Sequence, residues 1–258
     1  MVRQALGALR AAVDLVLPAS CAACSAVAAG PLCRPCLAAV RVASRGVGPA
    51  GPRPPPPHLP ACWAGARFEG ALRLAVTAYK DEGRRDLRID LARLLGAALT
   101  AAAGDPAVRR RLALGEEVLV VPVPTAWASR RRRGDDPVGA LARAATAAVG
   151  RQDSGLVVVP ALVHTRRVAD QAHLGRAARA RNLEGSMAVA AGWTGVVRGA
   201  TCILVDDVVT TGATLVEAAA ALRGAGARHV VAATCATTPR HAPQPPLWPS
   251  NPQTSVST

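Results

Sequence analysis

Apolar residues recur along most of the chain with two spacings, which together predict alternating strands and helices. Short apolar runs are typical of buried strands, whereas Leu or Ala recurring every three or four residues is typical of amphipathic helices. Strands are predicted at 61–68, 117–123, 156–159, 201–205 and 229–234, and helices at 70–80, 86–103, 137–149 and 214–223. This alternation predicts an α/β fold with a parallel sheet flanked by helices.

Two regions lack this regular pattern, and they suggest how the chain is divided. Residues 43–60 are rich in Ser, Gly and Pro, which predicts an extended linker rather than a folded element. Residues 239–258 contain almost no core residues, and we expect a disordered tail there. The predicted parts are an N-terminal module at 1–42, the linker, a main domain at 61–238, and the tail.

Residues 1–17 predict a short amphipathic helix, whose apolar face is formed by Leu6, Leu9, Val13 and Val16. Arg10 and Asp14 interrupt the apolar stretch, which argues against an export signal. No apolar run approaches the roughly 20 residues of a membrane span. We therefore expect a cytoplasmic protein that does not insert into a membrane.

The charge balance favours polyanionic partners. The chain has 31 basic and 17 acidic residues and a formal net charge of +14, which suits phosphates or nucleic acid. Lys80 is the only lysine, and the excess of Arg, Ala, Gly and Pro is typical of a GC-rich genome. That bias explains Arg in place of Lys better than it explains the net positive charge.

An acidic pair followed by a Thr/Gly turn is the strongest chemical pattern in the chain. The predicted strand ends at Val205, Asp206 and Asp207 follow directly, and a helix is predicted to begin near Ala213. Ligands of open α/β sheets lie beyond the carboxyl ends of the strands, and a helix N-terminus binds phosphate. The carboxylates can accept hydrogen bonds from a ribose diol or hold Mg²⁺. The residues predicted to bind this ribose phosphate, besides the acidic pair, are Val208, Val209, Thr210, Thr211, Gly212, Ala213 and Thr214.

Three further segments are candidates for the same site. The run that ends in Arg133 and Gly134 follows a predicted strand, and guanidinium groups there can bind pyrophosphate. A solvated charge run or a nucleic-acid patch is the alternative. Lys80 is expected to pair with a phosphate, against the alternative of a chance surface lysine. Residues 164–182 bring cations and amides either over the site or onto an exposed helix.

Seven cysteines include two CxxC pairs, whose members are Cys21, Cys24, Cys33 and Cys36. An odd total without regular spacing is a poor disulfide framework. Two such pairs suit tetrahedral Zn²⁺ with four thiolates and a structural role. Two redox pairs and an iron–sulfur site are the alternatives.

The segment from Ile203 to Leu215 resembles the signature of type I phosphoribosyltransferases. The resemblance implies that Asp206 and Asp207 contact ribose hydroxyls, that the following loop binds the 5-phosphate, and that Arg133 and Gly134 belong to a pyrophosphate loop. With the four-Cys module ahead of it, the order of motifs resembles the ComF family, linked to handling imported single-stranded DNA in natural transformation. The resemblance covers about residues 10–238 and departs from the family after Gly134.

Two functions follow from these patterns. In the first, the chain is a phosphoribosyltransferase that binds 5-phosphoribosyl-1-pyrophosphate with Mg²⁺, with Asp206, Asp207, Arg133 and Lys80 as catalytic residues. The acceptor is not identified, because no general base stands out. In the second, it is a non-catalytic module that binds a ribose phosphate, single-stranded DNA or a DNA-uptake helicase. Scarce aromatic residues, 2% of the chain, weigh against extensive base stacking.

Overall fold

The computed structural model describes residues 20–124, 136–149, 155–165 and 185–238. Several predictions fall outside the described residues. They concern the helix at 1–17, the pair Arg133 and Gly134, most of the segment 164–182, and the tail at 239–258.

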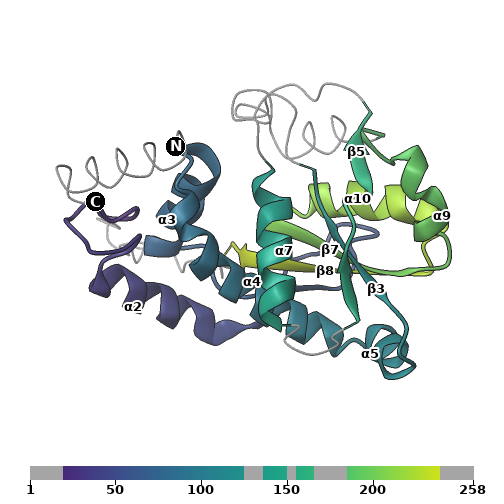
Figure 1. The fold of residues 1–258 in the computed structure, drawn as a ribbon, viewed down its shortest axis with the longest axis horizontal. Coiled ribbons are helices and arrows are strands. Elements are labelled where there is room, and N and C mark those ends of the chain that lie inside the picture. Colours follow the sequence, from purple (N-terminus) through teal and green to yellow (C-terminus); the bar gives the residue numbers. More distant parts are fainter. Residues whose placement is uncertain (1–19, 125–135, 150–154, 166–184, 239–258) are drawn as a thin grey trace, which may run out of the picture.

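A six-stranded sheet forms the centre of the molecule, in the order β1-β2-β8-β7-β3-β4 (Figure 1). All neighbouring strands are parallel except β1, which is antiparallel to β2 at one edge. The strands are β1 (Gly48–Pro49), β2 (Cys62–Ala64), β3 (Val118–Pro122), β4 (Leu156–Val158), β7 (Thr201–Val209) and β8 (His229–Thr237). The predicted α/β class with a mostly parallel sheet is confirmed.

Helices cover both faces of this sheet (Figure 1). The helices α4 (Arg88–Ala103) and α7 (Pro137–Val149) pack on each other and on one face, and α10 (Ala213–Gly224) packs on the other. The remaining helices are α2 (Arg34–Ala43), α3 (Gly70–Asp81), α5 (Pro106–Ala113) and α9 (Thr194–Val197), with 3₁₀ turns η1 (Ser44–Gly46), η2 (Arg85–Leu87) and η3 (Ala191–Trp193). In the described part of the chain, no helix has the length and apolarity needed to cross a bilayer.

A second, two-stranded sheet pairs β5 (Leu162–His164) with β6 (Met187–Val189) in antiparallel fashion. Neither strand was predicted from the sequence. The Thr165 hydroxyl donates to the Gly185 carbonyl at 2.8 Å just beyond the pairing. The described residues on either side of 166–184 are therefore held together near α10, which packs against both strands.

The side chains of the parallel strands alternate between two separate cores. Val118 and Val120 of β3 pack into the core beneath α4 and α7, whereas Leu119 and Val121 pack into the core beneath α10. Successive side chains of a strand point to opposite faces, and strands buried on both sides are continuously apolar. The run Glu117 to Val123 was predicted as a buried strand for this reason.

Two predicted boundaries are wrong in an informative way. The strand expected to end at Val205 continues to Val209, and the strand expected to end at Thr234 continues to Thr237. The two strands pair in parallel along this extra length, so their backbone hydrogen bonds continue past the polar side chains. The acidic pair is therefore part of a strand rather than of a turn.

The interpretation of residues 43–60 as a linker without folded elements is also wrong. This stretch contains η1 and β1, and β1 extends the main sheet by pairing with β2. Pro49 is compatible with this place because an edge strand need not donate every backbone N–H. The division of the chain into four parts stays a prediction.

Candidate functional site

The acidic pair lies near the carboxyl end of β7, next to the end of β3. Val205 is paired with Pro122, and its carbonyl accepts from the Val123 N–H at 2.8 Å. Asp206 and Asp207 follow, and each accepts the N–H of the next residue at 2.8 Å. These bonds hold both carboxylates at the sheet edge where ligands of α/β proteins are found.

Lys80 forms an ion pair with the acidic pair from a different part of the chain. It lies in the last turn of α3, and its Nζ is 2.7 Å from Oδ2 of Asp207. The Asp207 side chain is 8% exposed and that of Lys80 45%, so the pair is buried on one side and open on the other. The prediction that Lys80 belongs to the site is supported by this contact, whereas its predicted phosphate partner stays a prediction.

Burial and neighbouring charges together shift the pKa values of Asp206 and Lys80. Burial raises the pKa of Asp206 well above its usual range, the neighbouring Asp207 raises it further, and Lys80 opposes the shift. Burial alone would lower the pKa of Lys80, but the charges of Asp207 and Asp206 raise it above its ordinary value. Two carboxylates side by side repel each other when both are ionised, and Lys80 offsets this repulsion only in part, because the pKa of Asp206 stays raised.

The helix that carries Lys80 is anchored by Tyr79, for which no role was predicted. Tyr79 is 1% exposed, and its hydroxyl donates to the Pro137 carbonyl at 3.1 Å, at the start of α7. Arg85 donates to the Tyr79 carbonyl and lies over the Tyr79 ring, 4.9 Å from its centre. The neighbouring residues Tyr79 and Lys80 thus tie α3 to α7 and to β7. The signal in the sequence was that Tyr79 is the only tyrosine.

The turn that follows the acidic pair leads into α10 through a left-handed residue. Gly212 has φ of 77° and precedes the first residue of the helix, whose N-terminus no side chain caps in the manner of an N-cap. The Thr211 hydroxyl accepts from the Ala213 N–H at 3.4 Å, and Thr210 is exposed. An uncapped helix N-terminus with hydroxyl groups beside it suits an anion.

Val208 and Val209 are placed differently from the prediction that they belong to the binding turn. Both lie within β7, where Val208 packs toward the core of α4 and α7 and Val209 toward the core of α10. Their side chains contribute to packing, and only their backbone is near the turn. The turn itself begins at Thr210.

A segment of the supposed linker covers the Thr/Gly turn. A Cβ added to Gly212 would lie 2.8 Å from Leu59 Cδ1 and 3.5 Å from Pro56 Cγ. The His58 carbonyl also accepts from Arg223 Nη1 of α10 at 3.1 Å. Residues 56–59 therefore form one wall of the turn. This contact could not be predicted from the sequence, because a proline run shows no periodicity.

The remaining predicted residues are placed only at their flanks. Arg133 and Gly134 lie outside the described residues, between Pro124 after β3 and the start of α7. His164 Nε2 lies 3.1 Å from the Pro124 carbonyl, which connects the base of the 164–182 segment to the end of β3. The described ends of both segments thus meet at the carboxyl edge of the sheet.

The four N-terminal cysteines meet at one point. Their sulfur atoms all lie within 4.8 Å of one another, and Cys24 and Cys33 sulfurs are 3.6 Å apart. Four thiolates at about 2.3 Å from a tetrahedral zinc ion lie roughly 3.8 Å apart, so the cluster fits a zinc module. Backbone hydrogen bonds lower the pKa of Cys21 despite the opposing effect of burial, which favours a metal-binding thiolate.

This cysteine module is continuous with the wall of the site. Cys33 precedes the first residue of α2, Cys36 lies within it, and α2 packs against α3. Cys21, Leu32 and Val40 share a core with Leu72 and Val76 of α3. The module therefore supports the helix that presents Lys80.

Comparison with known proteins identifies a phosphoribosyltransferase-type domain. Residues 123–247 match the family model described as phosphoribosyl transferase domain, which includes β7, the Thr/Gly turn and α10. No curated protein matches the chain. Among solved structures, the allosteric regulatory enzyme of purine biosynthesis matches with 21% identity and a TM-score of 0.36, over 62% of this chain and 30% of that one. The match thus spans under a third of that enzyme.

We expect Gly212→Ala to destabilise the turn, because a left-handed alanine costs about 1–2 kcal/mol and its Cβ would contact Leu59. The free energy of unfolding in urea measures the loss. Leu59→Ala should restore part of it in the double variant. Gly224→Ala, at the other end of α10, is the control, since its Cβ meets nothing within 4 Å. Equal effects of Gly212→Ala and Gly224→Ala would contradict the close approach.

We expect Asp206→Asn to stabilise the chain at alkaline pH in buffer without divalent ions. Because the folded-state pKa of Asp206 is raised, the stability of the wild type is fully present below the unfolded pKa and is lost as pH rises through the folded pKa. The amide avoids this loss, so the variant should gain about 1 kcal/mol or more at about pH 9 and nothing near pH 4. Urea unfolding at both pH values measures this.

Glu82→Gln, which removes an exposed carboxyl just after α3, controls for the loss of one negative charge. A gain for Asp206→Asn that is the same at both pH values would show that ionisation of this carboxyl does not strain the fold.

Proposed function

We propose that the chain binds 5-phosphoribosyl-1-pyrophosphate, or a closely related ribose phosphate, and acts as a phosphoribosyltransferase. The observation that carries the proposal is the juxtaposition of Asp206, Asp207 and Lys80 directly before the uncapped N-terminus of α10. One end of this arrangement suits a ribose diol and the other suits a phosphate. The matched phosphoribosyl transferase domain model contains all of it except Lys80.

In this proposal each group has a separate task. Asp206 and Asp207 accept hydrogen bonds from the ribose hydroxyls, and the backbone from Thr211 to Thr214 holds the 5-phosphate. Lys80 offsets the negative charge of the acidic pair through its ion pair with Asp207 and adds positive charge where pyrophosphate departs. Arg133 and Gly134 are proposed to complete the pyrophosphate site from the loop after β3. Catalysis then rests on positioning and on stabilisation of charge.

Mg²⁺ fits this set of donors as a partner of the ligand. Carboxylate oxygens are ligands that Mg²⁺ prefers, and it retains several waters or phosphate oxygens. One Asp207 oxygen already contacts Lys80, so Asp206 and the remaining Asp207 oxygen would hold the ion directly or through water. When bound, Mg²⁺ would neutralise the negative charge of the pyrophosphate.

The order of motifs supports membership of the ComF family, and with it a link to DNA uptake. The four-Cys module, the Tyr79–Lys80 pair and the acidic strand follow one another as in that family. We further propose that the cysteine module holds structural Zn²⁺. The protein as a whole is proposed to act in the cytoplasm. A DNA-uptake helicase and single-stranded DNA are the partners this assignment implies.

Binding of 5-phosphoribosyl-1-pyrophosphate with Mg²⁺ should be measurable by calorimetric titration of the full chain. The Asp206→Asn/Asp207→Asn variant should bind at least roughly tenfold more weakly, because it loses the carboxylates that accept from the ribose. Asp90→Asn, which removes an α4 carboxylate paired with exposed Arg93, is the matched control and should bind as the wild type does. A folded wild type that gives no heat with this ligand would contradict the proposal.

The same variants separate a transferase from a nucleic-acid module. The net charge of +14 favours binding of single-stranded DNA, which should weaken with salt. DNA binding that is unchanged in Asp206→Asn/Asp207→Asn, together with no binding of the ribose phosphate, would favour the non-catalytic alternative.

Zinc should be present at one equivalent per folded chain, measured by elemental analysis after purification without chelator. Cys33→Ser should lower the zinc content and the midpoint of thermal unfolding, because a structural zinc site contributes directly to folding. Cys202→Ala, a buried cysteine of the sheet, is the control and should retain the metal. Iron in place of zinc, or full zinc content in Cys33→Ser, would overturn this assignment.

A further inference from the structure

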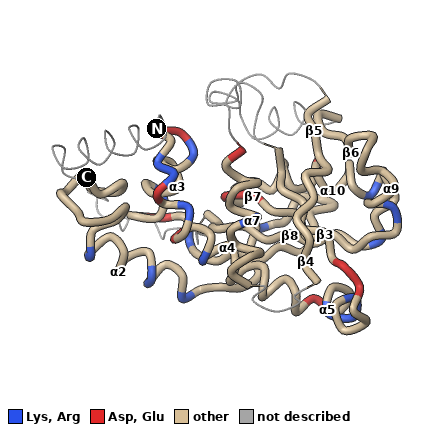
Figure 2. Tube along the Cα trace, in the orientation of Figure 1, with Lys and Arg blue, Asp and Glu red and all other residues tan. Residues whose placement is uncertain are grey.

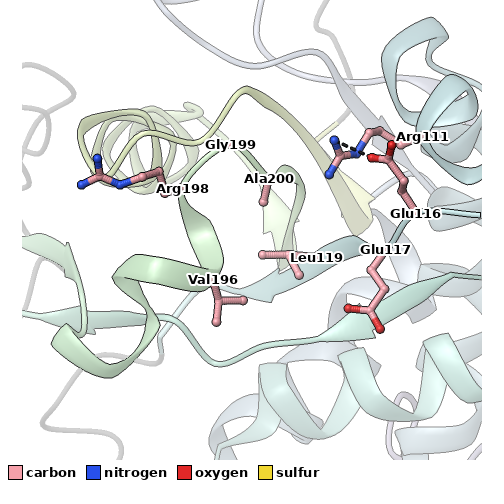
Figure 3. A pocket seen from close by; sticks show the side chains of 8 residues that line it. All are labelled: Arg111, Glu116, Glu117, Leu119, Val196, Arg198, Gly199 and Ala200. Atoms are coloured by element: carbon pink, nitrogen blue, oxygen red, sulfur yellow. Dashed lines mark ion pairs between the residues drawn. The ribbon is translucent and has the colours of Figure 1, made fainter. Parts of the chain in front are cut away.

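A pocket with several basic lining residues lies at the opposite end of the sheet from the acidic pair. It has a volume of about 610 Å³ and is formed by α5, the turn before β3 and the starts of β7 and β8. Its lining includes Arg110, Arg111, Thr201, Arg228 and His229. A neighbouring pocket of about 410 Å³ shares Arg111 and Glu116 with it (Figure 3).

The acids near this pocket are already engaged. Asp105 Oδ1 caps the first turn of α5 through Ala107 N–H at 3.0 Å and Val108 N–H at 3.3 Å, and it also lies 3.0 Å from His229 Nε2. Glu116 forms a 2.6 Å ion pair with Arg111, which Figure 3 shows on one side of the neighbouring pocket. Neither acid therefore neutralises the other arginines of the larger pocket.

Two guanidinium groups remain for a ligand. Arg110 and Arg228 both line the larger pocket, and neither makes an ion pair or a side-chain hydrogen bond within the part of the chain that the structure describes. They come from different elements, α5 and the turn before β8. Like charges that share a concave surface repel each other unless an anion lies between them. A guanidinium group binds phosphate through two parallel hydrogen bonds.

The lining of the pocket also offers an apolar surface beside the two arginines. Pro106, Ala107 and Leu114 of the α5 region also line it, and Leu114 is 63% exposed. A large exposed leucine beside two free arginines suits a ligand with a phosphate and an apolar or aromatic body. The volume lies within the range of small-molecule sites, roughly 300–1,000 Å³.

We propose that this pocket binds a small phosphorylated molecule, such as a nucleoside monophosphate, between Arg110 and Arg228. It is separate from the acidic site, because Thr201 opens β7 and Asp206 lies five residues further along the same strand. At about 3.3 Å per residue the two sites are roughly 16 Å apart.

A long polyanion fits this pocket less well than a compact phosphate. Asp105 directly precedes α5, and Glu116 and Glu117 follow it closely in sequence. Figure 2 shows acidic positions on the chain near the basic positions of α5. A nucleic-acid strand that crossed α5 would have to pass these carboxylates. A single phosphate between Arg110 and Arg228 does not have to cross α5, and the one carboxylate in the pocket lining, Glu116, is paired with Arg111.

The test is an NMR titration of the full, ¹⁵N-labelled chain with adenosine 5′-monophosphate, inorganic phosphate and, separately, oligothymidylate. The first two should shift the amide signals of Ala107, Thr201 and His229. Arg110→Gln/Arg228→Gln should weaken this binding at least roughly tenfold. Arg109→Gln, an exposed neighbour on α5 outside the pocket lining, should bind within about twofold of the wild type. Asp207→Asn should leave these shifts unchanged.

Three other results would overturn the proposal. Nucleotide shifts confined to Val209 and Gly212 would place the ligand at the acidic site alone. Equal binding by the wild type and Arg110→Gln/Arg228→Gln would show that the two arginines do not hold it. Shifts at Ala107 and Thr201 with oligothymidylate but not with the nucleotide would make this end of the sheet a nucleic-acid surface.

Discussion

The ion pair between Lys80 and Asp207 is the interaction on which the arrangement of the site depends. Two adjacent aspartates within a buried strand are unfavourable, because burial and mutual repulsion both oppose ionisation. Lys80 offsets this from the last turn of α3. Tyr79 fixes the helix to α7, and α2 with the cysteine cluster packs behind it. The negative charge of the acidic pair is therefore offset by Lys80 only while these parts are assembled around it.

This dependence explains why the N-terminal module and the sheet form one structure. Cys33 and Cys36 bracket the start of α2, and α2 shares a core with α3. On the other side, residues 56–59 cover Gly212 and contact α10. The chain between the cysteines and β2 thus contacts both α3, which carries Lys80, and the Thr/Gly turn with α10. The cysteine cluster, although distant in sequence from the acidic pair, is therefore connected to it through α2 and α3.

Much of this was predictable from the sequence, for physical reasons. Buried parallel strands are continuously apolar, and amphipathic helices are periodic, so β3, α3 and α7 were predicted with nearly their observed bounds. The acidic pair and the Thr/Gly turn stood out because few structures need that many polar groups at the end of a strand. Lys80 stood out because the composition otherwise excludes lysine.

The features that were missed depend on contacts between distant segments. The extension of β7 through Asp206 and Asp207 requires the equally long β8 beside it, which no local pattern specifies. The pairing of β1 with β2 and the contact of Leu59 with Gly212 arise from a proline-rich stretch that has no periodicity. The pocket with Arg110 and Arg228 forms from residues more than a hundred positions apart, so only the fold brings them together.

The most direct test of the account is a double-mutant cycle between Lys80 and Asp207, read out as affinity for 5-phosphoribosyl-1-pyrophosphate with Mg²⁺. Lys80→Met and Asp207→Asn should each weaken binding. If the two groups act as a unit, the double variant should bind no more weakly than the weaker single variant. Losses that simply add, or a Lys80→Met variant that binds as the wild type does, would show that Lys80 does not sustain the acidic pair for ligand binding.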